Sequence, residues 1–109
     1  MVLKNQSNLK FKMFIKQHTT HDKRILLAIC DKEIKGQEIE EDGACLNLKA
    51  DFFNGEEVSE ETAISMIQTA DLLNVVGTRA VELIKKLGLA HEDETKKICN
   101  IPYILITLG

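Results

Sequence analysis

The chain has 109 residues, and with 44% hydrophobic and 28% charged residues its composition is that of one globular domain spanning residues 1–109. The formal net charge of −3 is unevenly divided, because residues 1–24 carry six basic residues and one acid, whereas the rest carry eight basic residues and sixteen acids. This composition excludes a disordered or collagen-like chain, and the longest apolar run, residues 25–30, is too short to cross a bilayer, so we expect a soluble cytoplasmic protein.

The first half of the chain predicts three strands. After a flexible N-terminus over residues 1–9, apolar and polar side chains alternate in residues 10–16, as in a strand with one buried face. The apolar run at residues 24–30 predicts a second strand that forms a hairpin with the first. The acidic, glycine-containing residues 31–43 indicate a loop with one helical turn, and residues 44–53 a third strand.

The second half predicts two helices and a last strand. Ser59 is a suitable N-cap for a first helix, whose apolar residues recur at helical spacing to about Asn74. A second helix follows Gly77 and ends near Lys86, and residues 103–108 are strand-prone. The order of elements predicts an α+β fold, in which two consecutive helices pack on one face of a small, mainly antiparallel sheet.

One face of the predicted first strand is basic. A row of cations around an aromatic ring is a combination that follows a phosphate backbone and stacks an unpaired base. The residues in this row are Lys10, Lys12, Phe14 and Lys16, with Lys23 and Arg24 extending it across the hairpin turn. The alternative is an edge strand that its lysines keep soluble.

The segment DLLNVVGTRA, residues 71–80, is interpreted as the joint between the two helices. Gly77 and Thr78 begin the second helix, and a helix N-terminus favours an anion. Arg79 opposes the helix dipole there, so we expect it either to pair with Asp71 or to contact an anionic ligand. The simpler interpretation is a packing corner at which Asn74 caps the helix.

The sequence predicts no metal, cofactor or catalytic residue. His18 and His21 lie three residues apart in the predicted turn, and no further ligands follow at a recognisable spacing. The three cysteines form no C-x-x-C pair, which indicates free thiols. No nucleophile elbow, P-loop or dinucleotide fingerprint is present.

From about residue 10 onward, the sequence resembles an archaeal family known as domain of unknown function 424. The resemblance depends on D-x-x-x-x-G after the second strand, an F-x-G-E turn, an A-D-x-x-N-x-x-G-x-x-A-V block and a proline before the last strand. The matching positions are Asp31, Gly36, Phe53, Gly55, Glu56, Ala70, Asp71, Asn74, Gly77, Ala80, Val81, Gly88 and Pro102. Members commonly have a histidine after this proline, where the chain has Tyr103. The resemblance implies a cytosolic archaeal protein that is linked to translation and binds RNA.

Three functions are therefore considered. The first is a non-enzymatic accessory factor that binds RNA or a ribonucleoprotein through the basic strand and Arg79. The second is a protein interaction module or homodimer that binds no nucleic acid and uses an exposed strand. The third is a small-molecule enzyme with a pocket around Asp71, Asn74 and Arg79.

Overall fold

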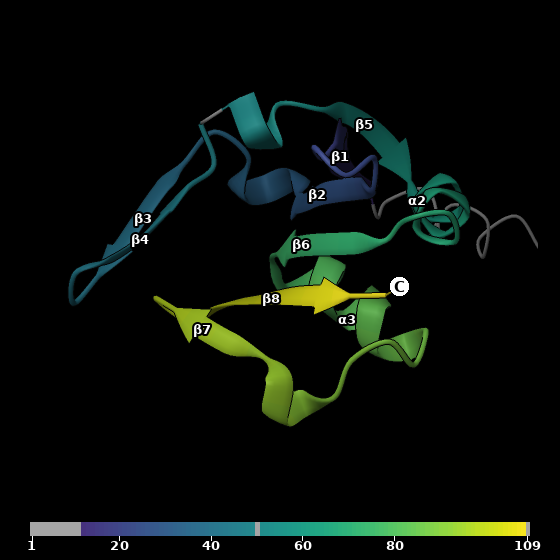
Figure 1. The fold of residues 1–109 in the computed structure, drawn as a ribbon. Helices are drawn as coiled ribbons and strands as arrows, with labels where there is room; N and C mark the ends of the chain where they lie inside the picture. Colours follow the sequence, from purple (N-terminus) through teal and green to yellow (C-terminus); the bar gives the residue numbers. More distant parts are fainter. Residues whose placement is uncertain (1–11, 50, 109) are drawn as a thin grey trace, which may run out of the picture.

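A six-stranded sheet forms the centre of the computed structural model, which describes residues 12–49 and 51–108 (Figure 1). In spatial order its strands are β5 (Glu56–Ser59), β1 (Lys12–Thr19), β2 (Ile25–Asp31), β6 (Leu72–Val76), β8 (Ile101–Thr107) and β7 (Lys96–Ile98). The central pair, β2 and β6, is parallel, and every other neighbouring pair is antiparallel. The sheet is mainly antiparallel, as the sequence predicts.

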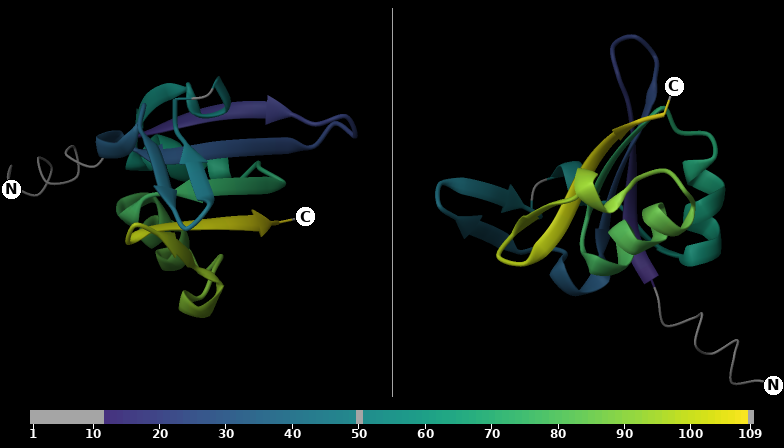
Figure 2. Two further views of the ribbon diagram at one scale, coloured as in Figure 1. Left: turned by 90° about the vertical axis from the view of Figure 1, so that its left-hand side faces the viewer. Right: turned by 90° about the horizontal axis from the view of Figure 1, so that it is seen from below.

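The two faces of this sheet carry different elements (Figure 2). Helices α2 (Glu60–Ile67) and α3 (Thr78–Lys86) lie on one face, and the hairpin of β3 (Glu38–Glu41) and β4 (Ala44–Asn47) projects from the other. Three 3-10 turns complete the described chain, namely η1 (Lys32–Ile34), η2 (Asp51–Phe53) and η3 (Glu92–Glu94). Within the described ranges, no helix is long and apolar enough to cross a membrane.

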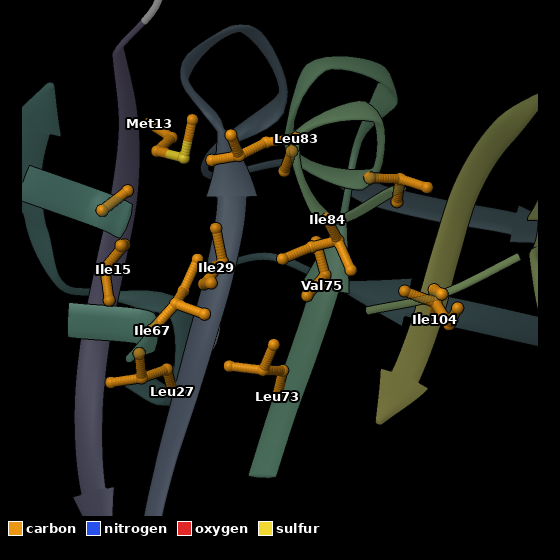
Figure 3. Packing of buried hydrophobic residues seen from close by; sticks show 14 residues of the cluster. Met13, Ile15, Leu27, Ile29, Ile67, Leu73, Val75, Leu83, Ile84 and Ile104 are labelled. Atoms are coloured by element: carbon orange, nitrogen blue, oxygen red, sulfur yellow. The ribbon is translucent and has the colours of Figure 1, made fainter. Parts of the chain in front are cut away.

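The larger core lies between the sheet and the two helices (Figure 3). Met13 and Ile15 of β1 point into it, whereas their neighbours on the strand face the other side, which confirms the predicted alternation. Ile67 of α2 and Ile84 of α3 close this core from above the sheet. Burial of these apolar side chains holds both helices on one face, as predicted.

A smaller core lies on the hairpin face. Cys30 of β2 and Val76 of β6 point into it, and Ile39, Leu48 and Phe53 cover them from the hairpin and η2. Residues 27–30 are consequently buried on both faces of the sheet. This double burial explains why β2 is a continuous apolar run rather than an alternating one.

The predicted consecutive helices are wrong. The first helix ends at Ile67, and Leu72–Val76 form strand β6 between β2 and β8, so a central strand separates the helices and the sheet is larger than expected. The sequence LLNVV suits a strand because Val75 and Val76 are β-branched, and both are buried. The segment thought to join two helices is therefore a strand, a turn and a helix start.

Three further strands, β3, β5 and β7, lie in segments that we expected to be loops or exposed surface. β3 and β4 pair only with each other, across a turn in which Asp42 and Gly43 have positive φ, so residues 44–53 are not a third strand of the main sheet. β5 pairs with β1, and β7 pairs with β8, at the two edges of the sheet. All three are short and rich in charge, which hides them from a search for apolar alternation.

Candidate functional site

The end of β2 and the start of α3 meet at a buried carboxylate. The Asp31 Oδ2 atom accepts a hydrogen bond of 3.0 Å from the Arg79 amide, and Oδ1 accepts one of 2.8 Å from the Ala80 amide. Gly77 has a φ of +117°, and a Cβ atom on it would lie 2.4 Å from Asp31 Cγ. Gly77 is therefore required both by its backbone conformation and by the carboxylate packed against it.

Asp31 is the one buried charged or polar side chain in the described part of the chain, with 6% exposure. Burial raises the pKa of this carboxyl group, and this effect outweighs the two amide hydrogen bonds and the charge of Arg79. Because the Arg79 and Ala80 amides donate to Asp31, these two amides of the α3 N-terminus are not available to an external anion. The sequence identified Asp31 only as a position that matches the family motif, and did not predict that its buried carboxylate caps the start of α3.

Arg79 does not pair with Asp71. Its Nε atom lies 3.8 Å from Glu33 Oε2, at the opposite end of β6 from Asp71. The surrounding pocket has a volume of about 520 Å³, and three of its lining side chains are acidic against one basic side chain. The lining residues are Asp31, Glu33, Ile34, Gly77, Thr78, Arg79, Glu82 and Ile101. This charge balance disfavours a phosphate ligand.

Asp71 and Asn74 both take part in holding the strands of the sheet together. Asp71 Oδ2 accepts a 2.8 Å hydrogen bond from the Ile25 amide, and its backbone oxygen accepts one of 2.7 Å from Leu108, so it joins β2, β6 and the end of β8. Asn74 lies at the centre of β6, paired with Ala28 of β2 and with β8. The expected pocket around Asp71, Asn74 and Arg79 is not formed, because Asp71 and Arg79 lie beyond opposite ends of strand β6, which is about 13 Å long.

Gly55 is also explained by a close backbone approach. It lies between η2 and β5, and a Cβ atom there would be 2.1 Å from the carbonyl oxygen of Ile15. Only glycine permits this approach of the chain to β1. Gly55, like Gly77, therefore has a clear structural reason to be a motif position.

The hairpin-side face of β1 brings together the predicted cations and one cation that sequence reasoning missed. Lys12 is exposed, Phe14 is half-buried, and the Lys16 ammonium donates a 3.0 Å hydrogen bond to the Asp51 carbonyl. Lys35, which follows η1, places its Nζ atom over the Phe14 ring, 4.8 Å from the centroid. We call Lys12, Phe14, Lys16 and Lys35 the β1 basic face.

The cations of the β1 basic face differ from most others in their partners. None of its three lysines forms a salt bridge with a carboxylate in residues 12–49 and 51–108. By contrast, the neighbouring Lys32 pairs with Glu57 at 2.9 Å. A phosphate could therefore approach these ammonium groups without breaking a salt bridge, although Lys12 interacts electrostatically with Glu57, the residue paired with Phe14 across β1 and β5.

The other residues of the predicted RNA-binding row lie farther away. Lys23 and Arg24 are in the β1–β2 turn, which extends beyond the rest of the sheet (Figure 2). Arg24 pairs there with Asp22 at 3.2 Å. The turn is about 23 Å from Lys12, because β1 has eight residues. Lys10 is outside the described residues.

The two predicted turn histidines have different surroundings. His18 belongs to β1, where its ring stacks on Phe52 with centroids 4.6 Å apart and one ring nitrogen lies 3.0 Å from the Phe52 carbonyl oxygen. The expectation that it lies in the turn is wrong, because β1 continues to Thr19. His21 is in the turn and exposed. No cluster of three metal-ligating side chains is found among the described residues.

Comparisons with known proteins agree with the resemblance seen in the sequence. The model of a family described as "Protein of unknown function (DUF424)" matches residues 18–107. A crystal structure of an uncharacterized conserved protein from Methanopyrus kandleri is similar, with 25% identity and a TM-score of 0.74 over 87% of this chain and 90% of that chain. No curated protein gives a significant match.

Proposed function

The chain belongs to the family described as "Protein of unknown function (DUF424)". From the charges on its surface, we propose that it is an RNA-binding accessory protein. In this proposal the β1 basic face contacts the phosphates, and Lys23 and Arg24 extend the contact toward the β1–β2 turn. The link to translation comes from the family resemblance alone.

The observation that carries the proposal is the arrangement of three ammonium groups around Phe14. Lys12 and Lys16 lie two residues to either side of Phe14 on the same strand, and Lys35 lies over its ring. Binding of a polyanion by lysines releases condensed counterions, so unpaired lysines contribute affinity that falls with salt. The half-buried ring between them offers a surface for a base.

The acidic part of the molecule supports this placement. Glu38, Glu40, Glu41 and Asp42 are exposed on the β3–β4 hairpin. The Cys99 amide donates a 2.7 Å hydrogen bond to Glu41 Oε1, which places the hairpin tip near the β7–β8 turn. This turn lies at the edge of the sheet that is farther from β1. Repulsion between these carboxylates and phosphates would keep RNA on the β1 side of this face.

A salt series with charge-matched variants tests the proposal. Binding of the wild type, of Lys12→Glu/Lys35→Glu and of Lys96→Glu/Lys97→Glu to a mixed pool of single-stranded RNA is measured by fluorescence anisotropy. The control pair lies on β7, is exposed, and forms no salt bridge with a described carboxylate. Both double variants change the net charge equally.

The wild type should bind with a logarithmic salt slope of about −3.5 if five phosphates are neutralised, and loss of two contacts should reduce the slope by about 1.4. The control variant should keep the wild-type slope. Equal weakening of both variants would show that only overall charge matters, and absence of binding at low salt would overturn the proposal.

A second function, protein–protein contact or self-association, is favoured by Leu105. This side chain is 72% exposed on the hairpin face of β8 and is one of two exposed large hydrophobic side chains in the described residues. A partner or a second copy that covered this leucine would remove its apolar surface from water. Sedimentation equilibrium of the wild type and Leu105→Glu tests it, and a monomer at all concentrations for both proteins would count against a homodimer.

A further inference from the structure

The Phe14 ring has a cation where a base would stack. The Lys35 Nζ atom lies over this ring, 4.8 Å from its centroid, while the ring also packs against the smaller core, which includes Cys30 and Val76. Phe14 is half-buried, so the core holds the ring in position and the lysine side chain shields its open part. Access to the ring therefore depends on movement of Lys35.

Lys35 can leave the ring without a change in the backbone. Its side chain has four rotatable bonds, and its ammonium forms no salt bridge with a described carboxylate that would hold it. A stacked base interacts with an aromatic ring more strongly than an exposed ammonium does. The displaced ammonium would then lie beside the nucleotide, where it can contact a phosphate.

The neighbouring lysines set the direction of the bound strand. Lys12 and Lys16 are each about 7 Å from Phe14 along β1 and point to the same side. A nucleic acid strand that runs along β1 would therefore meet an ammonium before and after the ring. This order suits a backbone that follows the lysines while one base turns inward.

We infer that the β1 basic face selects unpaired nucleotides, with one base stacked on Phe14 in the place of the Lys35 ammonium. This inference rests on the proposed RNA-binding function and deepens it by naming the class of RNA. In a duplex every base is already stacked and paired, so a duplex could contact only the lysines. Single strands, loops and bulges would gain the additional stacking contact.

The test separates the base from the phosphates. Binding is compared for a uridine decamer and for a decamer of the same length without bases, each with the wild type, Phe14→Leu and Phe52→Leu. Phe52 is the matched control, because it is a half-buried phenylalanine that packs against the same core but stacks on His18. Circular dichroism and thermal melting verify that the variants are folded.

The wild type and Phe52→Leu should bind the uridine decamer about tenfold more tightly than the decamer without bases. Phe14→Leu should lose this preference and keep the salt slope. If neither decamer binds the wild type, the proposed RNA function fails. If both bind but Phe14→Leu keeps the preference, RNA binding stands and the inference about Phe14 is wrong.

Two further variants cover the case in which Phe14→Leu does not fold. The sequence contains no tryptophan, so Phe14→Trp introduces a single fluorescent reporter at the proposed stacking position. Its emission should be quenched by the uridine decamer and not by the decamer without bases, and equal quenching would overturn the inference. Lys35→Met should retain the preference for bases with a salt slope about 0.7 smaller, and loss of that preference would also contradict it.

Discussion

The contact between Gly77 and Asp31 allows a sharp test of how the chain is packed where β2 and β6 end and α3 begins. In Gly77→Ala, the new methyl group would lie 2.4 Å from Asp31 Cγ and within 2.8 Å of both carboxylate oxygens. Real Cβ atoms do not approach other atoms so closely, so the carboxylate or the backbone must move. Either movement weakens the hydrogen bonds from the Arg79 and Ala80 amides to Asp31.

The expected loss of stability has two parts. A side chain at φ +117° and ψ +152° occupies a region that is used almost only by glycine, which costs about 1–3 kcal/mol. Weakening the hydrogen bonds to a buried carboxylate costs about 1.5–3 kcal/mol more. We therefore expect Gly77→Ala to lower the free energy of unfolding by about 2.5–6 kcal/mol, a large part of the 5–15 kcal/mol typical of a domain.

Urea denaturation followed by far-ultraviolet circular dichroism measures this loss. Gly43→Ala is the control, because Gly43 also has a positive φ, of +86°, but a Cβ atom on it would meet no other atom within 4 Å, and we expect a loss of about 1–2 kcal/mol. Asp31→Ala removes all three atoms that the methyl group would meet. In the Asp31→Ala protein, Gly77→Ala should therefore lower the free energy of unfolding by at least about 1 kcal/mol less than it does in the wild type. If the losses of the two single variants simply add in the double variant, the proposed contact is refuted.

Three further outcomes follow from the same structure. Burial raises the pKa of Asp31, so its contribution to stability is complete below about pH 3.8 and declines as the pH rises through the folded-state pKa; Asp31→Asn should remove this decline in urea denaturation measured across pH. Gly55→Ala should separate β5 from β1, because its Cβ atom would lie 2.1 Å from the Ile15 carbonyl oxygen, and hydrogen exchange should show faster exchange of the β1 amides that bond to β5. Burial raises the pKa of the Cys30 thiol to about 11, so at pH 8 a thiol reagent should modify two exposed cysteines rapidly and Cys30 only after unfolding; rapid modification of all three would contradict its burial.

The sequence predicts the first hairpin and both helix starts because each depends on local patterns. Alternation in β1, the apolar run of β2 and the Ser59 cap, whose hydroxyl accepts a hydrogen bond from the Thr62 amide, are properties of neighbouring residues. Strand β6 was missed because Leu73 continues the helical spacing of α2. The choice is made by tertiary pairing of Leu72–Val76 with β2 and β8, which a local pattern does not contain.

The site divides in the same way. The row of Lys12, Phe14 and Lys16 follows from strand alternation, so it can be read from the sequence. The position of Lys35 over Phe14 depends on the path of η1 after β2, and the contact of Asp31 with Gly77 depends on the parallel pairing of β2 and β6. These are contacts between distant parts of the chain, and only the fold brings them together.

The most direct test of the central proposal is to find where RNA touches the protein. The ¹⁵N-labelled protein is titrated with a uridine decamer, and amide chemical shifts are followed by nuclear magnetic resonance. If the β1 basic face binds RNA, the largest changes should lie in residues 12–16 and around Lys35, with smaller ones at the β1–β2 turn. Changes concentrated around Leu105 or Arg79, with β1 unaffected, would contradict the proposal.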